Sequence, residues 1–195
     1  MDKLDFDVIV VGGGPAGSSA ARMAAENGCT VALIEKEKEI AETVRTSGVT
    51  WISDIKKFGI PEDCYNPIKK FSFCSPKNSV VIEDKIAKAA VLDVRKTYRF
   101  LASRAESSGS QVFVSTNVSE VLQDSNGNCT GVIAKSGEKQ IQFNGKVVID
   151  ASGFASVVAK ELGYVKQWKK FGVGAEFEVK TEKLEYDNWW LMVGQ

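Results

Sequence analysis

A glycine-rich turn between an apolar run and an alanine-rich run constrains the fold of this chain more than any other feature. Residues 6–11 (FDVIVV) are apolar and β-branched, which is typical of a buried strand in a parallel sheet. Residues 12–17 (GGGPAG) follow at once. Residues 18–27 contain four alanines and predict a helix that ends at Gly28. Residues 30–34 form a second apolar run, so the sequence predicts a βαβ unit.

The residue types in this turn fit a site for a diphosphate. Gly12 allows the tight turn out of the strand, Gly14 lets an anion approach the backbone, and Gly17 lets the helix pack close to the sheet. Pro15 falls at the first helical position, where its missing N–H costs nothing. The first helical turn, which includes Ala16, has free N–H groups and the positive end of the helix dipole, and both favour a diphosphate.

A carboxylate ends the second predicted strand. Glu35 follows Gly12 by 23 positions, near the spacing at which a carboxylate binds the ribose hydroxyls of an adenine dinucleotide. It would repel a 2′-phosphate, which disfavours NADP. Lys36 belongs to the same motif, although residues 36–39 also fit a solvated run of charges. The whole pattern predicts a dinucleotide site but does not separate FAD from NAD. The alternative is a glycine-rich turn without a ligand.

The composition excludes several classes of function. Lys+Arg and Asp+Glu are both 25, and a zero net charge argues against a nucleic-acid partner. The chain has no histidine, which excludes Ser-His and Cys-His nucleophile pairs and His-containing metal sites. The four cysteines form no C-x-x-C pair, so we expect reduced thiols in a cytoplasmic protein and no metal. No apolar run reaches the roughly 18 residues of a membrane-spanning helix.

The remainder of the chain continues the alternation of helices and strands. Asp93 is a plausible N-cap of a helix that ends near residues 107–109, and Asn126-Gly127 indicates a hairpin turn. Further strands are expected at residues 111–115, 117–122, 131–134, 140–143 and 145–150, and a helix at 156–162. We therefore expect an α/β fold: a Rossmann-like, FAD/NAD(P)-binding parallel sheet with an inserted β-meander.

Three segments resemble a known family. They are residues 11–36, residues 92–101 and residues 149–163. In this order and spacing they resemble the FAD-dependent geranylgeranyl reductases, which include the digeranylgeranylglycerophospholipid reductases and share the hydroxybenzoate-hydroxylase type of FAD fold. The resemblance implies FAD as the cofactor and hydride delivery to a prenyl C=C bond of an isoprenoid lipid, followed by protonation. It covers only the N-terminal half of such proteins, which are about twice as long.

The resemblance also implies roles for residues outside the glycine turn. Arg95 would approach the flavin nucleotide, and Ser47 and Gly48 would lie near the isoalloxazine ring. A simpler interpretation of Arg95 is a solvated charge at a helix start. Members of the reductase family often carry Cys-Gly where this chain has Ser47-Gly48. Halogenases carry a Gly-Glu-Ser signature at that place, which this chain lacks.

Three more residues complete the site that the resemblance implies. A backbone group of Val118 would meet the adenine ring, and Asp150 and Gly153 would lie near the FAD diphosphate. Asp150 alternatively caps the turn that follows it. Ser152 stands where hydroxylases carry an aspartate. Two further functions therefore stay open: an FAD-dependent monooxygenase or halogenase-like protein, and a truncated FAD-binding module without activity. No catalytic residue, proton donor or external electron donor can be named.

The predicted domain organisation is an FAD-binding domain followed by the start of a second domain. We expect the first domain at residues 1–165, with residues 66–84 contributing strands to the substrate domain, and an incomplete, mostly antiparallel substrate domain at residues 166–195. The alternating pattern of residues 172–179 predicts a strand, and Trp189-Trp190 predicts a buried one, with a lipid-accepting surface as the alternative. An incomplete sheet leaves an open edge, so we expect self-association. A lipid substrate would also fit a peripheral position at the membrane.

Overall fold

The computed structural model describes residues 1–166, 172–175, 177, 179–180 and 185–194. The chain forms two compact units, and each is built from two stretches of sequence. Unit 1 consists of residues 1–43 and 98–172, and unit 2 consists of residues 44–97 and 173–195.

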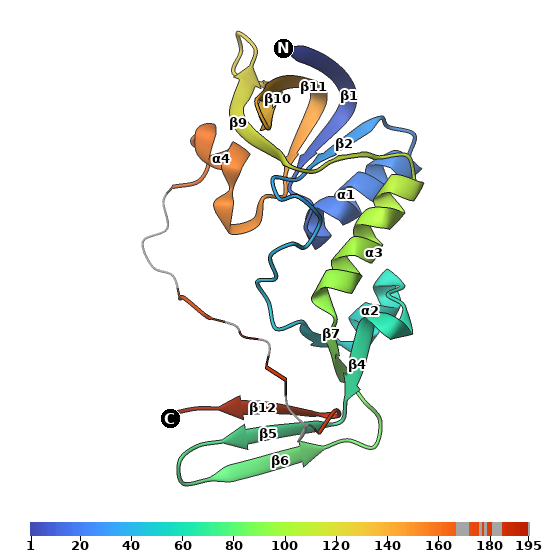
Figure 1. Ribbon diagram of the computed structural model, residues 1–195, viewed down its shortest axis with the longest axis vertical. Coiled ribbons are helices and arrows are strands. Elements are labelled where there is room, and N and C mark those ends of the chain that lie inside the picture. Colours follow the sequence, from blue (N-terminus) through green and yellow to red (C-terminus); the bar gives the residue numbers. More distant parts are fainter. Residues whose placement is uncertain (167–171, 176, 178, 181–184, 195) are drawn as a thin grey trace. The chain divides into compact units, whose positions relative to one another are not determined.

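Unit 1 is built on a six-stranded sheet with the strand order β8-β2-β1-β11-β10-β9 (Figure 1). Its strands are β1 (Asp2–Val11), β2 (Val31–Ile34), β8 (Gln111–Phe113), β9 (Thr116–Gln123), β10 (Cys129–Ser136) and β11 (Lys139–Asp150). β1 pairs in parallel with both β2 and β11, and β2 pairs in parallel with β8. β9, β10 and β11 form an antiparallel meander. The expected Rossmann-like parallel sheet with an inserted meander is confirmed.

Helices cover both faces of this sheet. They are α1 (Pro15–Glu26), residues 98–107 of α3 (Val94–Ser107), the short 3-10 helix η2 (Gly153–Ala155) and α4 (Val157–Glu161). Val8 and Val10 of β1 pack in one cluster with Ala21 of α1 and Ala105 of α3. Because side chains alternate along a strand, the intervening residues of β1 point to the opposite face.

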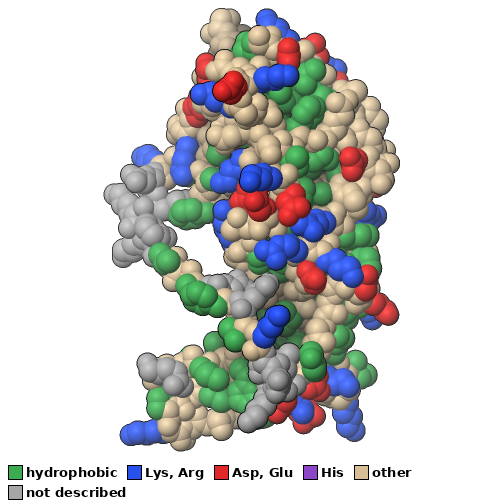
Figure 2. All heavy atoms as spheres, viewed as in Figure 1, with side chains coloured by type: hydrophobic (Ala, Val, Ile, Leu, Met, Phe, Trp, Pro, Cys, Tyr) green, Lys and Arg blue, Asp and Glu red, His purple; other side chains and the backbone are tan. Residues whose placement is uncertain are grey.

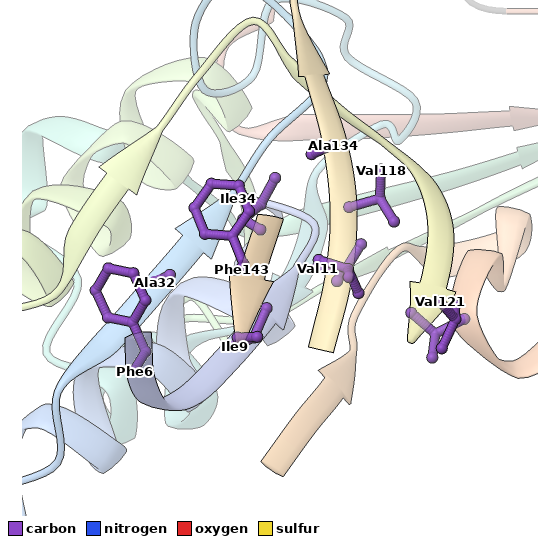
Figure 3. Close-up of a cluster of buried hydrophobic side chains, with 11 residues drawn as sticks. Phe6, Ile9, Val11, Ala32, Ile34, Val118, Val121, Ala134 and Phe143 are labelled. Carbon is purple, nitrogen blue, oxygen red and sulfur yellow. The ribbon is translucent and has the colours of Figure 1, made fainter. Parts of the chain in front are cut away.

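That opposite face carries the larger core. Ile9 and Val11 of β1 lie there with Ala32 and Ile34 of β2 and with apolar residues of the meander (Figure 3). Phe143 of β11 is completely buried in this cluster. The meander and α4 thus enclose a face that an open sheet would leave in water.

One expectation for this sheet is wrong. Residues 140–143 and 145–150 are not two strands, because β11 runs unbroken from Lys139 to Asp150. Gly145 does not interrupt it. A Cβ atom at Gly145 would lie 2.8 Å from Cδ1 of Ile9, so the glycine gives the neighbouring strand room to pack.

Unit 2 contains two three-stranded sheets, with the orders β3-β7-β4 and β12-β5-β6. Its elements are β3 (Val49–Trp51), α2 (Ile52–Phe58), the 3-10 helix η1 (Glu62–Cys64), β4 (Tyr65–Ile68), β5 (Lys70–Cys74), β6 (Ser79–Glu83), β7 (Ala89–Leu92) and β12 (Asn188–Met192). β5 and β6 form an antiparallel hairpin, and β12 adds to β5 in parallel.

Two expectations for the C-terminal segment need correction. Residues 172–179 were expected to form a strand, but the described residues among them, 172–175, 177 and 179, carry none. The interpretation of Trp189-Trp190 as a buried strand is half right. The strand is there, and the Trp189 ring packs against Phe71 and Phe73 at centroid distances of 6.1 and 6.2 Å. Trp190 is 49% exposed, because it points to the other face of a sheet that the described residues leave open.

Candidate functional site

The glycine turn of unit 1 is shaped by backbone contacts at two of its glycines. Gly12 has a φ of +110°, and a Cβ atom there would lie 2.4 Å from the carbonyl oxygen of Ala151, at the end of β11. A Cβ atom at Gly17 would lie 1.9 Å from the carbonyl oxygen of Gly12. Both positions therefore need glycine for packing. The absence of side chains at Gly12 and Gly17 lets the start of α1 pack closely against the ends of β1 and β11.

Gly14 differs from these two glycines because the space beside it is open. A Cβ atom at Gly14 would meet no atom of the described residues within 4 Å. Gly14 is the N-cap of α1, and no side chain caps the helix or places an acid in its first turn. The first N–H groups of a helix lack partners within the helix, and the positive end of its dipole favours an anion. The open space and the uncapped helix start, where Pro15 and Ala16 lie, fit a diphosphate.

Glu35 is held in place by backbone N–H groups. Its Oε2 accepts a hydrogen bond from the N–H of Gly13 at 2.7 Å, and its Oε1 accepts one from the N–H of Glu37 at 2.9 Å. A carboxylate has about four acceptor positions, so capacity remains on each oxygen for a further donor. The expected carboxylate thus lies directly beside the glycine turn, with its orientation fixed by the turn itself.

Two residues that stabilise the turn were missed by sequence reasoning. The hydroxyl of Ser18, which is fully buried, donates to the carbonyl oxygen of Gly13 at 3.1 Å. A Cβ atom at Gly13 would lie 2.4 Å from Cδ1 of Ile40. Gly13 and Ser18 can be seen in the sequence, but their contacts cannot. Ile40 comes from a loop far along the chain, and the carbonyl of Gly13 meets Ser18 only once the turn has folded.

The loop after β2 is more structured than a solvated run of charges. Glu39 forms an ion pair with Arg99 at 2.7 Å, and Oε2 of Glu37 accepts a hydrogen bond from the N–H of Thr43 at 2.8 Å. The side chain of Glu39 is still 57% exposed, so the charges of residues 36–39 are solvated as well as paired. Lys36 is exposed, and its contribution to binding stays a prediction.

Val118 lies on β9, the edge strand of the sheet. Its side chain is buried in the core cluster (Figure 3), and the contact of its backbone with the adenine ring stays a prediction. The N–H of Thr116, two residues earlier, donates to the carbonyl oxygen of Glu35 at 2.9 Å. The start of β9 and the carboxylate that ends β2 are thereby brought together.

Asp150 caps the turn that follows β11. One carboxylate oxygen accepts hydrogen bonds from the N–H and the hydroxyl of Ser152, and the other accepts one from the N–H of Ala159 at 2.8 Å. Burial raises the pKa of Asp150, but these hydrogen bonds outweigh it and hold the pKa below its ordinary value. The capping interpretation is confirmed. Gly153, with a φ of +65° and open space beside it, lies in the turn that Asp150 holds.

The remaining predicted residues lie in unit 2, where they are close together. Gly48 has a φ of +76°, and a Cβ atom there would lie 2.8 Å from the carbonyl oxygen of Leu92, at the end of β7. Ser47 is exposed beside it, and Arg95 is exposed in the first turn of α3. Asp93 is confirmed as the N-cap of this helix, because its side chain accepts a hydrogen bond from the N–H of Lys96 at 2.9 Å.

The fold and the glycine turn define a class: α/β proteins that bind an adenine dinucleotide at the first βαβ unit. A family model for FAD dependent oxidoreductases matches residues 7–164. The chain therefore belongs to the FAD dependent oxidoreductase family.

Its relatives include lipid reductases. A digeranylgeranylglycerophospholipid reductase of Methanocaldococcus jannaschii is 35% identical over 186 residues, which cover 92% of this chain and 46% of that protein. An uncharacterized protein in the nifH2 5′ region of Methanosarcina barkeri is 30% identical over 177 residues, which cover 84% of this chain and 90% of that protein. The chain thus spans about half the length of the reductases but nearly the full length of a shorter relative.

Solved structures agree with the fold. A geranylgeranyl bacteriochlorophyll reductase-like protein of Thermoplasma acidophilum matches with a TM-score of 0.76 and 28% identity, over 83% of this chain and 42% of that one. A flavin-dependent brominase matches with a TM-score of 0.66 and 23% identity, over 83% of this chain and 41% of that one, and shares the fold alone. Among the described residues, no helix is long and apolar enough to cross a membrane.

Proposed function

We propose that this chain is the FAD-binding part of a reductase that saturates prenyl C=C bonds of isoprenoid lipids. The observation that supports FAD binding most strongly is the open, uncapped start of α1 at Gly14, beside a carboxylate fixed by the N–H of Gly13. The named activity of the digeranylgeranylglycerophospholipid reductase relatives supports the choice of substrate.

In this proposal the residues of unit 1 bind the adenosine and diphosphate parts of FAD. The diphosphate binds at the start of α1, where Pro15 and Ala16 lie, through the free backbone N–H groups of the first turn. The carboxylate of Glu35 accepts hydrogen bonds from the ribose hydroxyls. The backbone of Val118 meets the adenine ring, and Lys36 lies beside the ribose. Because the carboxylate of Asp150 is occupied by its own turn, it acts by holding the backbone at Gly153 near the diphosphate.

The family resemblance supports the roles proposed for Ser47, Gly48 and Arg95. Ser47-Gly48 lies near the isoalloxazine ring, and the guanidinium of Arg95 approaches the flavin nucleotide. When bound, FAD supplies the two-electron redox chemistry, and the protein orients and shields it. The chain has no histidine, so the proton that completes C=C reduction comes from water or another group. We further propose that residues 1–165 form the FAD-binding domain, that residues 66–84 contribute to the substrate domain, and that residues 166–195 begin it.

An absorbance titration tests the cofactor. Purified protein incubated with FAD and desalted is expected to retain bands near 370 and 450 nm, roughly where flavins absorb. A protein that takes up no FAD would refute the proposal. To test the reaction, the FAD-loaded protein is reduced without oxygen and mixed with a geranylgeranylated glycerophospholipid. Anaerobic reoxidation with loss of C=C bonds supports the reductase. Reoxidation only after oxygen is admitted would favour the monooxygenase or halogenase class.

A second candidate is an FAD-binding module without activity of its own. The observation that favours it is length, because the chain covers only 42–46% of several reductase relatives. In this case the protein retains FAD but its reduced flavin does not react with the lipid. The two experiments together separate loss of binding from loss of reaction.

A further inference from the structure

Strand β6 is the most exposed strand in the described part of unit 2. All five of its residues are exposed, and Val80, Val81 and Ile82 each show more than half of their surface to solvent. Since neighbouring side chains point to opposite faces, both faces of β6 are apolar and uncovered. Figure 2 shows hydrophobic side chains gathered over the sheet to which β6 belongs.

The backbone of β6 is also available on one side. β6 lies at the edge of its sheet and pairs only with β5 among the described strands. The N–H of Asp84 donates to the carbonyl of Lys69, and the N–H of Ser75 donates to the carbonyl of Asn78. Hydrogen-bonded pairs alternate along an antiparallel ladder, so the even-numbered residues of β6 bond to β5. Ser79, Val81 and Glu83 therefore present their N–H and C=O groups outward.

The edges of the sheet in unit 1 are protected, which sets β6 apart. β8 is only three residues long. On β9 the N–H of Val121 donates to the Glu161 carboxylate of α4 at 3.0 Å, so a side chain covers that edge. β6 is longer than β8 and no side chain of the described residues covers its edge, and its central residues carry no charge, proline or bulge of the kind that blunts natural edge strands.

We propose that β6 pairs antiparallel with β6 of a second copy of this chain, across a two-fold axis at Val81. This register brings the outward-facing residues opposite one another: Ser79 faces Glu83 of the second copy, Val81 faces Val81, and Glu83 faces Ser79. Each such pair exchanges two N–H···O bonds. The β12-β5-β6 sheet then continues into its copy as a single six-stranded sheet.

The side chains favour this register and this occupant. Val81 packs on Val81 on one face, and Val80 packs on Ile82 on the other, so apolar residues meet apolar residues throughout. Glu83 can accept a hydrogen bond from the Ser79 hydroxyl of the second copy, so polar residues meet at both ends of the paired strands. A shift by two residues keeps only two of the three pairs and places Val81 opposite Ser79 or Glu83. The strand is thus complementary to itself.

The test is the mass of the protein in solution, measured by light scattering during gel filtration. At tens of micromolar we expect the wild type to have twice the mass of one chain. Val81→Lys and Val81→Glu should each be monomeric, since the two-fold axis places two like charges together. An equimolar mixture of the two variants should regain the doubled mass, because residue 81 of one copy faces residue 81 of the other.

Controls separate this pairing from other routes to a dimer. Val173, which is 87% exposed in the same unit, provides the matched variant Val173→Lys, and this variant should stay dimeric. Circular dichroism melts should show that the Val81 variants remain folded, as expected for a side chain that is 56% exposed. A monomeric wild type, a dimeric Val81→Lys, or a mixture that stays monomeric would overturn the proposal. Loss of the dimer in Leu191→Lys but not in Val81→Lys would also overturn the proposal, because it would place the contact at the β12 edge of the sheet.

Discussion

Replacing Gly14 with valine should abolish FAD binding while leaving the fold intact. The backbone at Gly14 is extended, with φ −68° and ψ −176°, which any residue can adopt, and an added Cβ would meet nothing within 4 Å. Glycine is a better N-cap residue than valine, so the substitution costs about 1 kcal/mol of stability at this position. Valine also lowers the conformational entropy of the unfolded chain, which offsets up to about 1 kcal/mol of that loss. The free energy of unfolding should therefore change by no more than about 1 kcal/mol.

The effect on binding should be far larger. The valine side chain fills the space through which a diphosphate reaches the first N–H groups of α1. Each hydrogen bond to a charged group contributes about 1.5–3 kcal/mol, so two lost bonds cost about 3–6 kcal/mol. At 1.4 kcal/mol for each tenfold change, FAD should bind about 10²- to 10⁴-fold more weakly.

The assay is quenching of flavin fluorescence on titration with protein, paired with a thermal melt of each variant. Gly174 is a matched control, because its Cβ position is also open, its backbone needs no positive φ and it lies outside the turn. Gly174→Val should bind FAD as the wild type does. If Gly14→Val binds FAD within threefold of the wild type, the diphosphate does not lie at this helix start, and the assignment of the site is refuted.

Three further predictions concern the structure around the turn. Gly17→Ala should cost about 3 kcal/mol or more and greatly lower the melting temperature, because its Cβ would lie 1.9 Å from the carbonyl oxygen of Gly12; a melt like that of the wild type would contradict this packing. Glu35→Gln should cost about 1–3 kcal/mol, or several degrees in melting temperature, since an amide has one acceptor oxygen for two backbone N–H groups. Asp150→Asn should be less stable than the wild type at neutral pH, and the difference should shrink as the pH falls. The pKa of Asp150 is depressed in the folded state, so its contribution is complete above the unfolded pKa, about 3.9, and is lost as the pH falls through the folded pKa. Urea melts at several pH values check this, and a constant difference would speak against the carboxylate as the cause.

The βαβ unit was predictable because its determinants are local. Apolar β-branched runs, a glycine turn and an alanine-rich helix follow one another without interruption, and the structure places β1, α1 and β2 accordingly. The cap at Asp93 was equally local. The place of Glu35 at the end of β2 followed from spacing, but its hydrogen bond to the N–H of Gly13 did not, because it depends on how the turn and the next loop fold together.

Other features depended on distant partners and could not be read from the sequence. Gly145 resembled a break between strands, yet it is a packing site for Ile9, which lies far away in the chain. The exposure of Trp190 depends on what covers the sheet, and the pattern of its own segment gives no information about that. Ser47-Gly48 and Arg95 are far apart in the sequence, and the pairing of Gly48 with the end of β7 brings them together.

The parallel pairing of β1 with β11 has a consequence for synthesis of the chain. Asp2 pairs with Ile141, so β1 leaves the ribosome well before its neighbour β11 has been made. At about 5–20 residues per second, this interval lasts roughly 7–30 seconds. Throughout it, Ile9 and Val11 have no meander to cover them, and they form an apolar surface that a chaperone can recognise. The residues at the glycine turn are therefore translated long before they reach their final environment.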